Sequence, residues 1–150
     1  MSELRAHGLG LRVRRGWEAR VWMPDLPPPA ENHPVVRLAN FALPNSRNTY
    51  AEDVADALRP GQVVASLAEF SPHLADRGLY APQGVPRVGV EDLDRRAVQR
   101  QARGRAGVQR FFSVHGRAFS LYVVASGGHR LAEALRDLDA QLHELAVERR

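Results

Sequence analysis

Two adjacent strand-like segments constrain the fold of this chain more than any other feature. Residues 108–114 and 117–124 are separated only by His115-Gly116. An x-Gly pair suits a two-residue turn in which both central residues have positive φ. The register of such a turn pairs Val114 with Arg117, Phe112 with Phe119, Arg110 with Leu121 and Val108 with Val123. The sequence therefore predicts a β-hairpin with one mostly apolar, core-facing side.

The opposite face of this hairpin is a candidate binding surface. It carries two aromatic residues among smaller neighbours: Gln109, Phe111, Ser113, Ser120 and Tyr122. Aromatic anchors over small polar residues can form a concave surface that accepts a partner. A helix packed over the same face is the alternative that this pattern leaves open.

A stripe of leucines predicts a C-terminal helix of about 18 residues that begins near His129. The stripe is spaced by four and three residues and consists of Leu131, Leu135, Leu138, Leu142 and Leu145. We expect the helix to pack across the sheet, and pairing with a second copy through the same stripe is the alternative. Residues 146–150 either finish this helix or add an edge strand.

Alternating residues elsewhere predict further strands. Residues 9–13 and 19–23 alternate on either side of Gly16-Trp17, which is typical of a second hairpin. Another strand is expected over 35–43. Residues 62–70 are apolar on both faces, so this strand should lie near the middle of a sheet whose two faces are covered.

Helical and irregular segments complete the predicted architecture. Short helices are expected at 51–58 and 92–103. The long irregular stretch 71–89 is rich in proline and glycine, and loops of this length in a compact domain are usually functional or mobile. The sequence therefore predicts one α+β domain over 1–150. It should contain a mostly antiparallel sheet of about six strands, packed against the C-terminal helix and one or two shorter helices.

The opening strand and turn resemble the start of PsbP-like domains, a superfamily that includes the DcrB-like proteins. The resemblance rests on residues 9–17, which read Leu-Gly-Leu-Arg-Val-Arg-Arg-Gly-Trp. Residues 39–44, 107–112 and 116–119 are also similar to small actinobacterial proteins. The resemblance implies an antiparallel sheet covered by helices, and non-catalytic work as an accessory subunit, adaptor or chaperone.

Composition excludes several kinds of chemistry. The chain of 150 residues contains no cysteine and no lysine, which excludes thiolate nucleophiles, disulfides, cysteine-ligated metals and Schiff-base catalysis. No two of its six histidines lie three to five residues apart, and no hydrolase or nucleotide-binding motif occurs. We therefore expect no catalytic residue, metal site or cofactor. Without an apolar leader or a long apolar run, we also expect a cytoplasmic protein that does not span a membrane.

Two polar residues interrupt apolar strand faces, namely Asn40 and Glu69. Buried polar groups need hydrogen-bond partners, so both are expected to be satisfied structural groups. Arg110 and Arg117 lie on the apolar side of the hairpin, and one of them is the expected partner of Glu69. A small-molecule or hydrolase pocket built around Asn40 and Glu69 is the alternative.

A cluster of arginines raises the question of nucleic-acid binding. The cluster occupies the segment from Arg95 to Arg110. Before Arg110 it contains Arg95, Arg96, Arg100, Arg103 and Arg105. Such a cluster could neutralise phosphates, but no aromatic residues interleave with it and no nucleic-acid-binding motif is present. The chain has arginine and no lysine at all. This bias is typical of a GC-rich genome, so the arginine cluster also reflects codon usage. The favoured hypothesis is a non-enzymatic domain that binds another protein.

Overall fold

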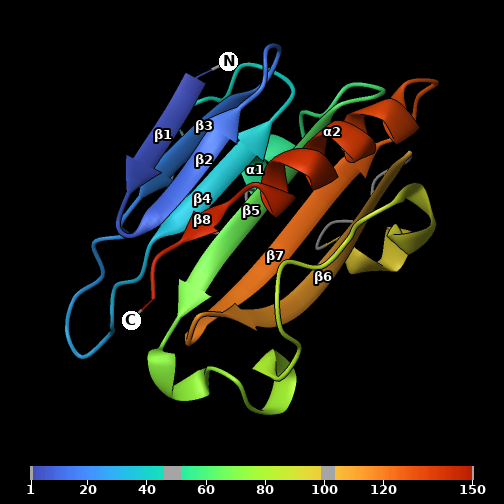
Figure 1. Cartoon of the computed structure of the whole chain (residues 1–150). Coiled ribbons are helices and arrows are strands. Elements are labelled where there is room, and N and C mark those ends of the chain that lie inside the picture. The colour runs from blue at the N-terminus through green and yellow to red at the C-terminus, as the bar shows by residue number, and fades with distance from the viewer. Residues whose placement is uncertain (1, 46–51, 99–103, 150) are drawn as a thin grey trace.

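A five-stranded antiparallel sheet forms the centre of the fold (Figure 1). The computed structural model describes residues 2–45, 52–98 and 104–149. In sheet order the strands are β3 (Glu18–Trp22), β4 (Val35–Ala39), β5 (Val63–Phe70), β7 (Arg117–Ser126) and β6 (Arg105–Val114). β5 occupies the middle of this sheet, which confirms the position predicted from its two apolar faces.

The β6–β7 hairpin has the register predicted from its turn. Val114 lies opposite Arg117 and Phe112 opposite Phe119, and the two phenylalanine rings stack with centroids 5.6 Å apart. His115 and Gly116 have φ of 50° and 76°. The turn therefore has the two positive φ values that bring the strands together with their natural twist.

A second, three-stranded sheet contains β1 (Ser2–Ala6), β2 (Leu9–Val13) and β8 (Ala146–Val147). The predicted hairpin between 9–13 and 19–23 is wrong, because β2 pairs with β1 and β8 while β3 pairs with β4. Apolar residues do alternate along β2 and β3, but the two strands belong to different sheets, and each contributes its apolar side to the core from its own sheet. β1 is mostly exposed, so it lacks the apolar alternation that would have revealed it as the true partner.

The C-terminal helix α2 (Leu131–His143) crosses the front of the central sheet, as Figure 1 shows. Its leucines pack inward: Leu135, Leu138 and Leu142 are fully buried, and Leu131 and Leu145 pack against the same core. A homo-oligomer through this stripe would therefore have to unpack the core. The helix is shorter than predicted, because the chain leaves it after His143 to form β8, which answers the open question about the C-terminal residues in favour of an edge strand.

The shorter helices differ from their predicted lengths. Helix α1 (Glu52–Ala55) lies in the first half of the segment predicted as helix 51–58. The helix predicted over 92–103 is reduced to a 3-10 turn, η4 (Arg95–Ala97), and residues 99–103 lie outside the described part of the chain. The physical reason is a competing strand contact, since the backbone N–H and C=O of Asp94 bond to Gly107 of β6 at 2.8 and 2.9 Å. A segment tied to a sheet edge in this way cannot continue as a helix.

The fold is thus α+β, with eight strands in two antiparallel sheets among the described residues, instead of about six in one. The main core lies between the front of the central sheet and the layer made by α2 and β2. Smaller apolar clusters lie on the back of the sheet. No helix within the described residues is long and apolar enough to cross a membrane.

Candidate functional site

The candidate binding surface of the hairpin lies on the back of the central sheet, where other segments cover most of it. Ser113, Ser120 and Tyr122 are buried, whereas Gln109 and Phe111 are half-buried. The side-chain amide of Gln109 donates to the Ser120 hydroxyl at 3.1 Å, and the Tyr122 hydroxyl donates to the Ala97 carbonyl at 3.1 Å. This face is therefore covered, in part by the short helix α1 (Glu52–Ala55), which packs beside Tyr122, and in part by irregular segments.

Residues 71–83 form the largest of these covering segments, and we call them the platform. The platform contains two 3-10 turns, η1 (Pro72–Leu74) and η2 (Gly78–Tyr80). The buried Ser113 hydroxyl donates to the Tyr80 carbonyl at 2.6 Å and accepts from the Asp76 N–H at 2.9 Å. The Tyr80 ring lies edge-on to Phe111 with centroids 5.5 Å apart. Two residues of the predicted surface thus act as the foundation of a loop.

Backbone pairing fixes the far end of the platform to the β6 edge. The Ser113 N–H donates to the Pro82 carbonyl at 2.8 Å, and the Gly84 N–H donates to the Ser113 carbonyl at 2.8 Å. Within the platform, the Gln83 amide donates to the Asp76 carboxylate at 2.7 Å. These bonds hold Asp76 at a φ of 65°, a left-handed conformation that most side chains avoid. The platform is therefore a rigid structure despite its lack of regular elements.

The rigid platform displays leucines to solvent. Leu74 is 42% and Leu79 is 68% exposed, while Met23 and Leu26 in the segment between β3 and β4 are 37% and 50% exposed. These four are among the five large hydrophobic residues that the described chain exposes; the fifth is Val90. Both segments leave the central sheet at the same end, because Trp22 pairs with Val35 and Val35 with Ala68. Figure 1 shows them at the lower end of the molecule.

A small polar cluster bridges these two segments. Glu31 accepts a hydrogen bond from His33 Nε2 at 3.1 Å and a second from the Ser71 hydroxyl at the start of the platform. These two bonds, and the nearby His73, hold the pKa of Glu31 below its usual range. The segment between β3 and β4 and the platform are therefore neighbours, and their exposed apolar residues belong to one end of the molecule.

Asn40 and Glu69 do not come together in a pocket. The Asn40 amide donates to the Gly61 carbonyl at 3.1 Å and accepts from the Val63 N–H at 2.8 Å, at the beginning of β5. Glu69 lies near the other end of that strand, about 20 Å away at the usual rise per residue. The pocket predicted around the pair is therefore wrong, and Asn40 has the satisfied structural role.

Glu69 forms the predicted ion pair with Arg117. Arg117 Nη2 lies 2.5 Å and Nε 3.2 Å from the carboxylate, and the two side chains are 4% and 0% exposed. The same guanidinium donates to the carbonyls of His7 at 2.9 Å, Gly8 at 3.1 Å and Glu148 at 3.3 Å. Arg117 thus ties the central sheet to the β1–β2 turn and to the end of β8. The ion pair is structural, because both of its side chains are buried.

The arginines of the cluster that the structure describes do not share one face of the sheet. Arg105 donates to the Leu58 carbonyl at 3.4 Å on the back of the sheet, whereas Arg110 lies on the front and pairs with Asp92 at 3.5 Å. Arg95 and Arg96 belong to η4. Arg100 and Arg103 lie outside the described residues. The strand alternation that separates Arg105 from Arg110 works against a shared phosphate-binding surface.

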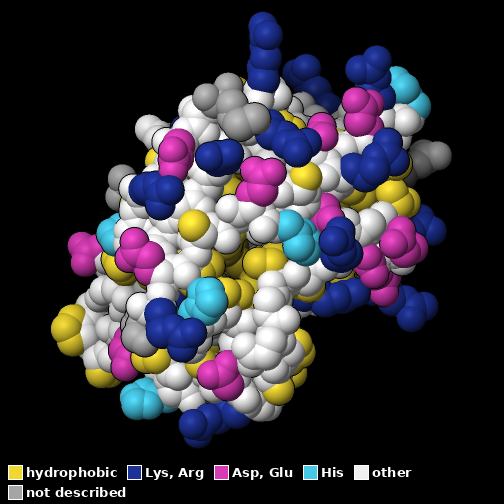
Figure 2. Space-filling view, viewed as in Figure 1, with side chains coloured by type: hydrophobic (Ala, Val, Ile, Leu, Met, Phe, Trp, Pro, Cys, Tyr) yellow, Lys and Arg dark blue, Asp and Glu magenta, His cyan; other side chains and the backbone are white. Residues whose placement is uncertain are grey.

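The front of the molecule has a groove of about 660 Å³ between α2 and residues 87–91. Figure 2 shows apolar side chains in the hollowed centre of this face. His143 Nδ1 lies 2.7 Å from the Asp139 carbonyl and 3.6 Å from its carboxylate, which resembles half of a catalytic dyad. The residues that line the groove include no hydroxyl or thiol for His143 to activate. Elsewhere, too, the described residues hold no cluster of three or more His, Asp or Glu that could bind a metal ion.

Comparison with known proteins gives no relative from which a function could be transferred. The chain matches no protein-family model, no curated protein and no solved structure. Function must therefore be inferred from the contacts and the exposure of its own residues.

The exposed leucines of the platform were missed by reading the sequence for motifs. One signal was present, because the irregular stretch 71–89 contains Leu74 and Leu79 with no helix or strand pattern that would bury them. A leucine in such a stretch either turns back into the core or remains in water. The bonds from Ser113 and the packing of Tyr80 decide the outcome, and neither contact is visible in the local sequence.

Proposed function

We propose that this chain is a non-enzymatic protein-interaction domain, working as an adaptor, accessory or chaperone-like module. We name its partner-binding region the two-loop surface, made by Met23, Leu26, Leu74, Arg77 and Leu79. The observation that carries the proposal is the display of exposed leucines on a platform that the sheet holds rigid. A rigid loop loses little conformational entropy on binding, so it can convert buried apolar area into affinity. The resemblance to PsbP-like domains points to the same kind of work.

The energy available from this surface is enough to matter. Complete burial of a large apolar side chain contributes about 2 kcal/mol. Scaled by their exposed fractions, the four apolar residues of the two-loop surface could contribute roughly 4 kcal/mol on binding. About half of this comes from Leu74 and Leu79. They are therefore the anchors whose removal should weaken a complex most.

Charge next to the leucines defines the partner more closely. Arg77 is exposed beside Leu79, and its guanidinium forms no ion pair or hydrogen bond with any described residue. The neighbouring carboxylate of Asp76 accepts from Gln83 instead. The partner that fits is a folded protein with an apolar pocket for the leucines and a carboxylate at the pocket rim facing Arg77. Arginine favours such contacts because its planar donors match a carboxylate.

The experiment compares partner capture by three forms of the chain in cells that produce it. The wild type is tested beside the double variant Leu74→Ser, Leu79→Ser and beside Val90→Ser. Val90 is a matched control, because it is 45% exposed but lies outside the two-loop surface, in the lining of the front groove. We expect a partner that the control retains and the double variant loses. With the purified partner, the double variant should bind about 30-fold more weakly, which is the equivalent of roughly 2 kcal/mol.

A charge reversal tests the electrostatic part of the proposal. Arg77→Glu should weaken the purified complex, and a carboxylate-to-lysine change at the facing rim of the partner should restore it. All variants should melt close to the wild type, because the altered side chains point into solvent. Capture that is indifferent to the double variant, or the absence of any captured partner, would overturn the proposal.

A further inference from the structure

A second cavity, of about 350 Å³, lies beside the first half of α2. Its walls come from four places in the chain: the turn before β3, the end of β4, the turn before β5, and the start of α2. The lining residues are Trp17, Asn40, Pro60, Gly61, Gln62, Gly128, His129, Arg130, Glu133, Ala134 and Asp137. A volume of this size suits a small ligand.

Much of the cavity wall is fixed. Both polar atoms of the Asn40 amide are engaged by backbone groups of the β5 turn. Gly128 packs directly on that turn, since a Cβ at this position would lie 2.7 Å from the Gly61 nitrogen. No residue other than glycine fits this close approach without movement of the backbone. The cavity is therefore preformed and does not depend on a mobile loop.

Several polar groups in the wall remain available to a ligand. The side chains of Arg130 and Glu133 form no hydrogen bond or ion pair with any described residue. The Gln62 side chain accepts from the Arg59 N–H through its oxygen, at 2.8 Å, which leaves its NH₂ group to donate. The wall thus offers both donors and an acceptor. A ligand hydroxyl, which donates and accepts at once, can bond to either kind.

The indole of Trp17 adds a flat apolar surface. Trp17 is half-buried and lines the cavity, and its side chain packs against the main core. Its backbone N–H donates to the Arg14 carbonyl at 3.1 Å, which closes the turn that carries the residue. An aromatic ring fixed next to hydrogen-bonding groups suits a ligand with one apolar face and one polar edge.

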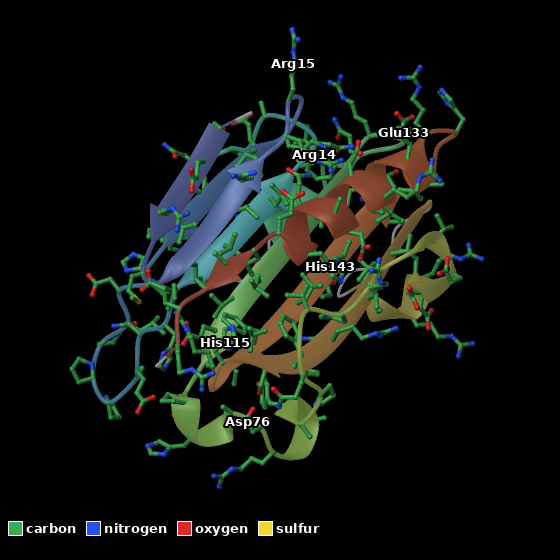
Figure 3. All side chains as sticks on the ribbon, in the orientation of Figure 1. Arg14, Arg15, Asp76, His115, Glu133 and His143 are labelled. Atoms are coloured by element: carbon green, nitrogen blue, oxygen red, sulfur yellow. The ribbon has the colours of Figure 1, made fainter. Side chains whose placement is uncertain are left out.

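The charges of the wall nearly cancel. Asp137 is paired with Arg14 at 3.1 Å, and Figure 3 shows Arg14 beside α2. The remaining carboxylate, that of Glu133, is offset by Arg130 three residues earlier on the same helix. A site with balanced charge gives no strong preference for an anion or a cation. We propose that this cavity binds a neutral polyhydroxylated ligand, a mono- or disaccharide whose C–H face lies on Trp17 and whose hydroxyls bond to Gln62, Arg130 and Glu133.

This site is separate from the two-loop surface. Gly61 and Asn40 stand where β5 begins, whereas the platform follows the end of β5. In Figure 3, Glu133 of the cavity and Asp76 of the platform lie at opposite ends of the molecule. Failure of either proposal therefore leaves the other intact.

The test uses the full chain labelled with ¹⁵N, and follows the indole N–H signal of Trp17 during titration with glucose and with trehalose. Trp22→Phe assigns the two indole signals. We expect a saturable shift of the Trp17 signal with at least one of the two sugars. Choline and sulfate serve as cationic and anionic probes, and they should give smaller shifts than the sugar does at equal concentration.

Variants connect this binding to the proposed contacts. Saturation-transfer measurements should show an apparent affinity for the sugar that is about tenfold weaker in Trp17→Ala. Trp17→Phe should restore part of this affinity. Glu133→Gln, at an exposed position where folding is not at risk, should weaken binding several-fold, while Glu144→Gln at the C-cap of the same helix should not. No saturable shift with either sugar, a stronger response to choline or sulfate, or equal binding by Glu133→Gln and the wild type would overturn the proposal.

Discussion

Replacement of Arg117 by methionine tests how strongly one buried guanidinium holds the two sheets together. Methionine keeps much of the length and apolar stem of arginine but removes its charge and its donors. The change removes the ion pair between Arg117 and the Glu69 carboxylate, whose side chain is 0% exposed. It also removes the donor to three backbone carbonyls next to the strands of the second sheet: those of His7 and Gly8 in the β1–β2 turn and of Glu148 after β8.

The expected loss is large because the Glu69 charge stays buried after its arginine partner is removed. Removing one member of a buried ion pair lowers the free energy of unfolding by about 4 kcal/mol. The three carbonyls are at the edge of the molecule, where water can replace the lost donor, so they add little. For a chain of this length, about 4 kcal/mol corresponds to a fall in Tm of roughly 10 °C. Arg110→Met is the matched control, and its exposed pair with Asp92 should cost less than about 1 kcal/mol.

Urea denaturation followed by circular dichroism measures these differences. Amide hydrogen exchange in β2 should accelerate in Arg117→Met, because the clamp on the preceding turn is gone. The double variant Glu69→Leu, Arg117→Met removes both charges, and it should be more stable than Arg117→Met alone. The reasoning is refuted if Arg117→Met costs no more than the Arg110→Met control, or if the double variant is destabilised by the sum of its two single changes.

Three further predictions follow from the same contacts. Ser113→Ala should destabilise the chain by about 2 kcal/mol, since it leaves two platform backbone groups without their partner; thermal melting measures this, and an unchanged Tm would contradict it. Leu138→Ala, at a fully buried site under α2, should cost about 3 kcal/mol in urea denaturation, whereas a loss below about 1 kcal/mol would mean that the site collapses around the gap. The carboxyl ¹³C titration of Glu31 should give a pKa below the usual 4.5 that rises in His33→Ala. Because this pKa is lowered by folding, the stability from Glu31 is present above its usual pKa and is lost as pH falls through the lowered value.

The parts of the fold that the sequence predicted are those set by neighbours along the chain. The β6–β7 hairpin follows from the turn at His115-Gly116 and from the apolar alternation beside it. β5 follows from its two apolar faces. The identity of the strand that pairs with β2 is not a local property, because β1 is polar and mostly exposed. Its pairing is stabilised by backbone bonds and by the distant Arg117, neither of which leaves a pattern in residues 2–6.

The Glu69–Arg117 ion pair and the supposed Asn40–Glu69 pocket were predictable to different degrees for a related reason. Pairing of Glu69 with an arginine could be predicted, because a buried carboxylate on an apolar face requires a cation and strand alternation puts Arg110 and Arg117 on the apolar face of the hairpin. The separation of Asn40 from Glu69 could not be predicted, because strand alternation states that two residues share a face but not that they share a place on it. Asn40 bonds to Val63 at the start of β5, and the six residues from there to Glu69 put the two side chains in different environments.

The back face of the hairpin explains why pattern reading can find important residues and still misjudge their role. Phe111 and Ser113 stand out because an aromatic ring and a hydroxyl alternate with core positions. Such a pattern indicates contact with something that is not the main core. It does not say whether that contact is a partner or another part of the chain. Here the contact is made by the chain's own platform, and the residues exposed to solvent are Leu74 and Leu79 of that platform. Substitution of Phe111 should therefore affect stability as well as binding, and only the exposed leucines can separate the two effects.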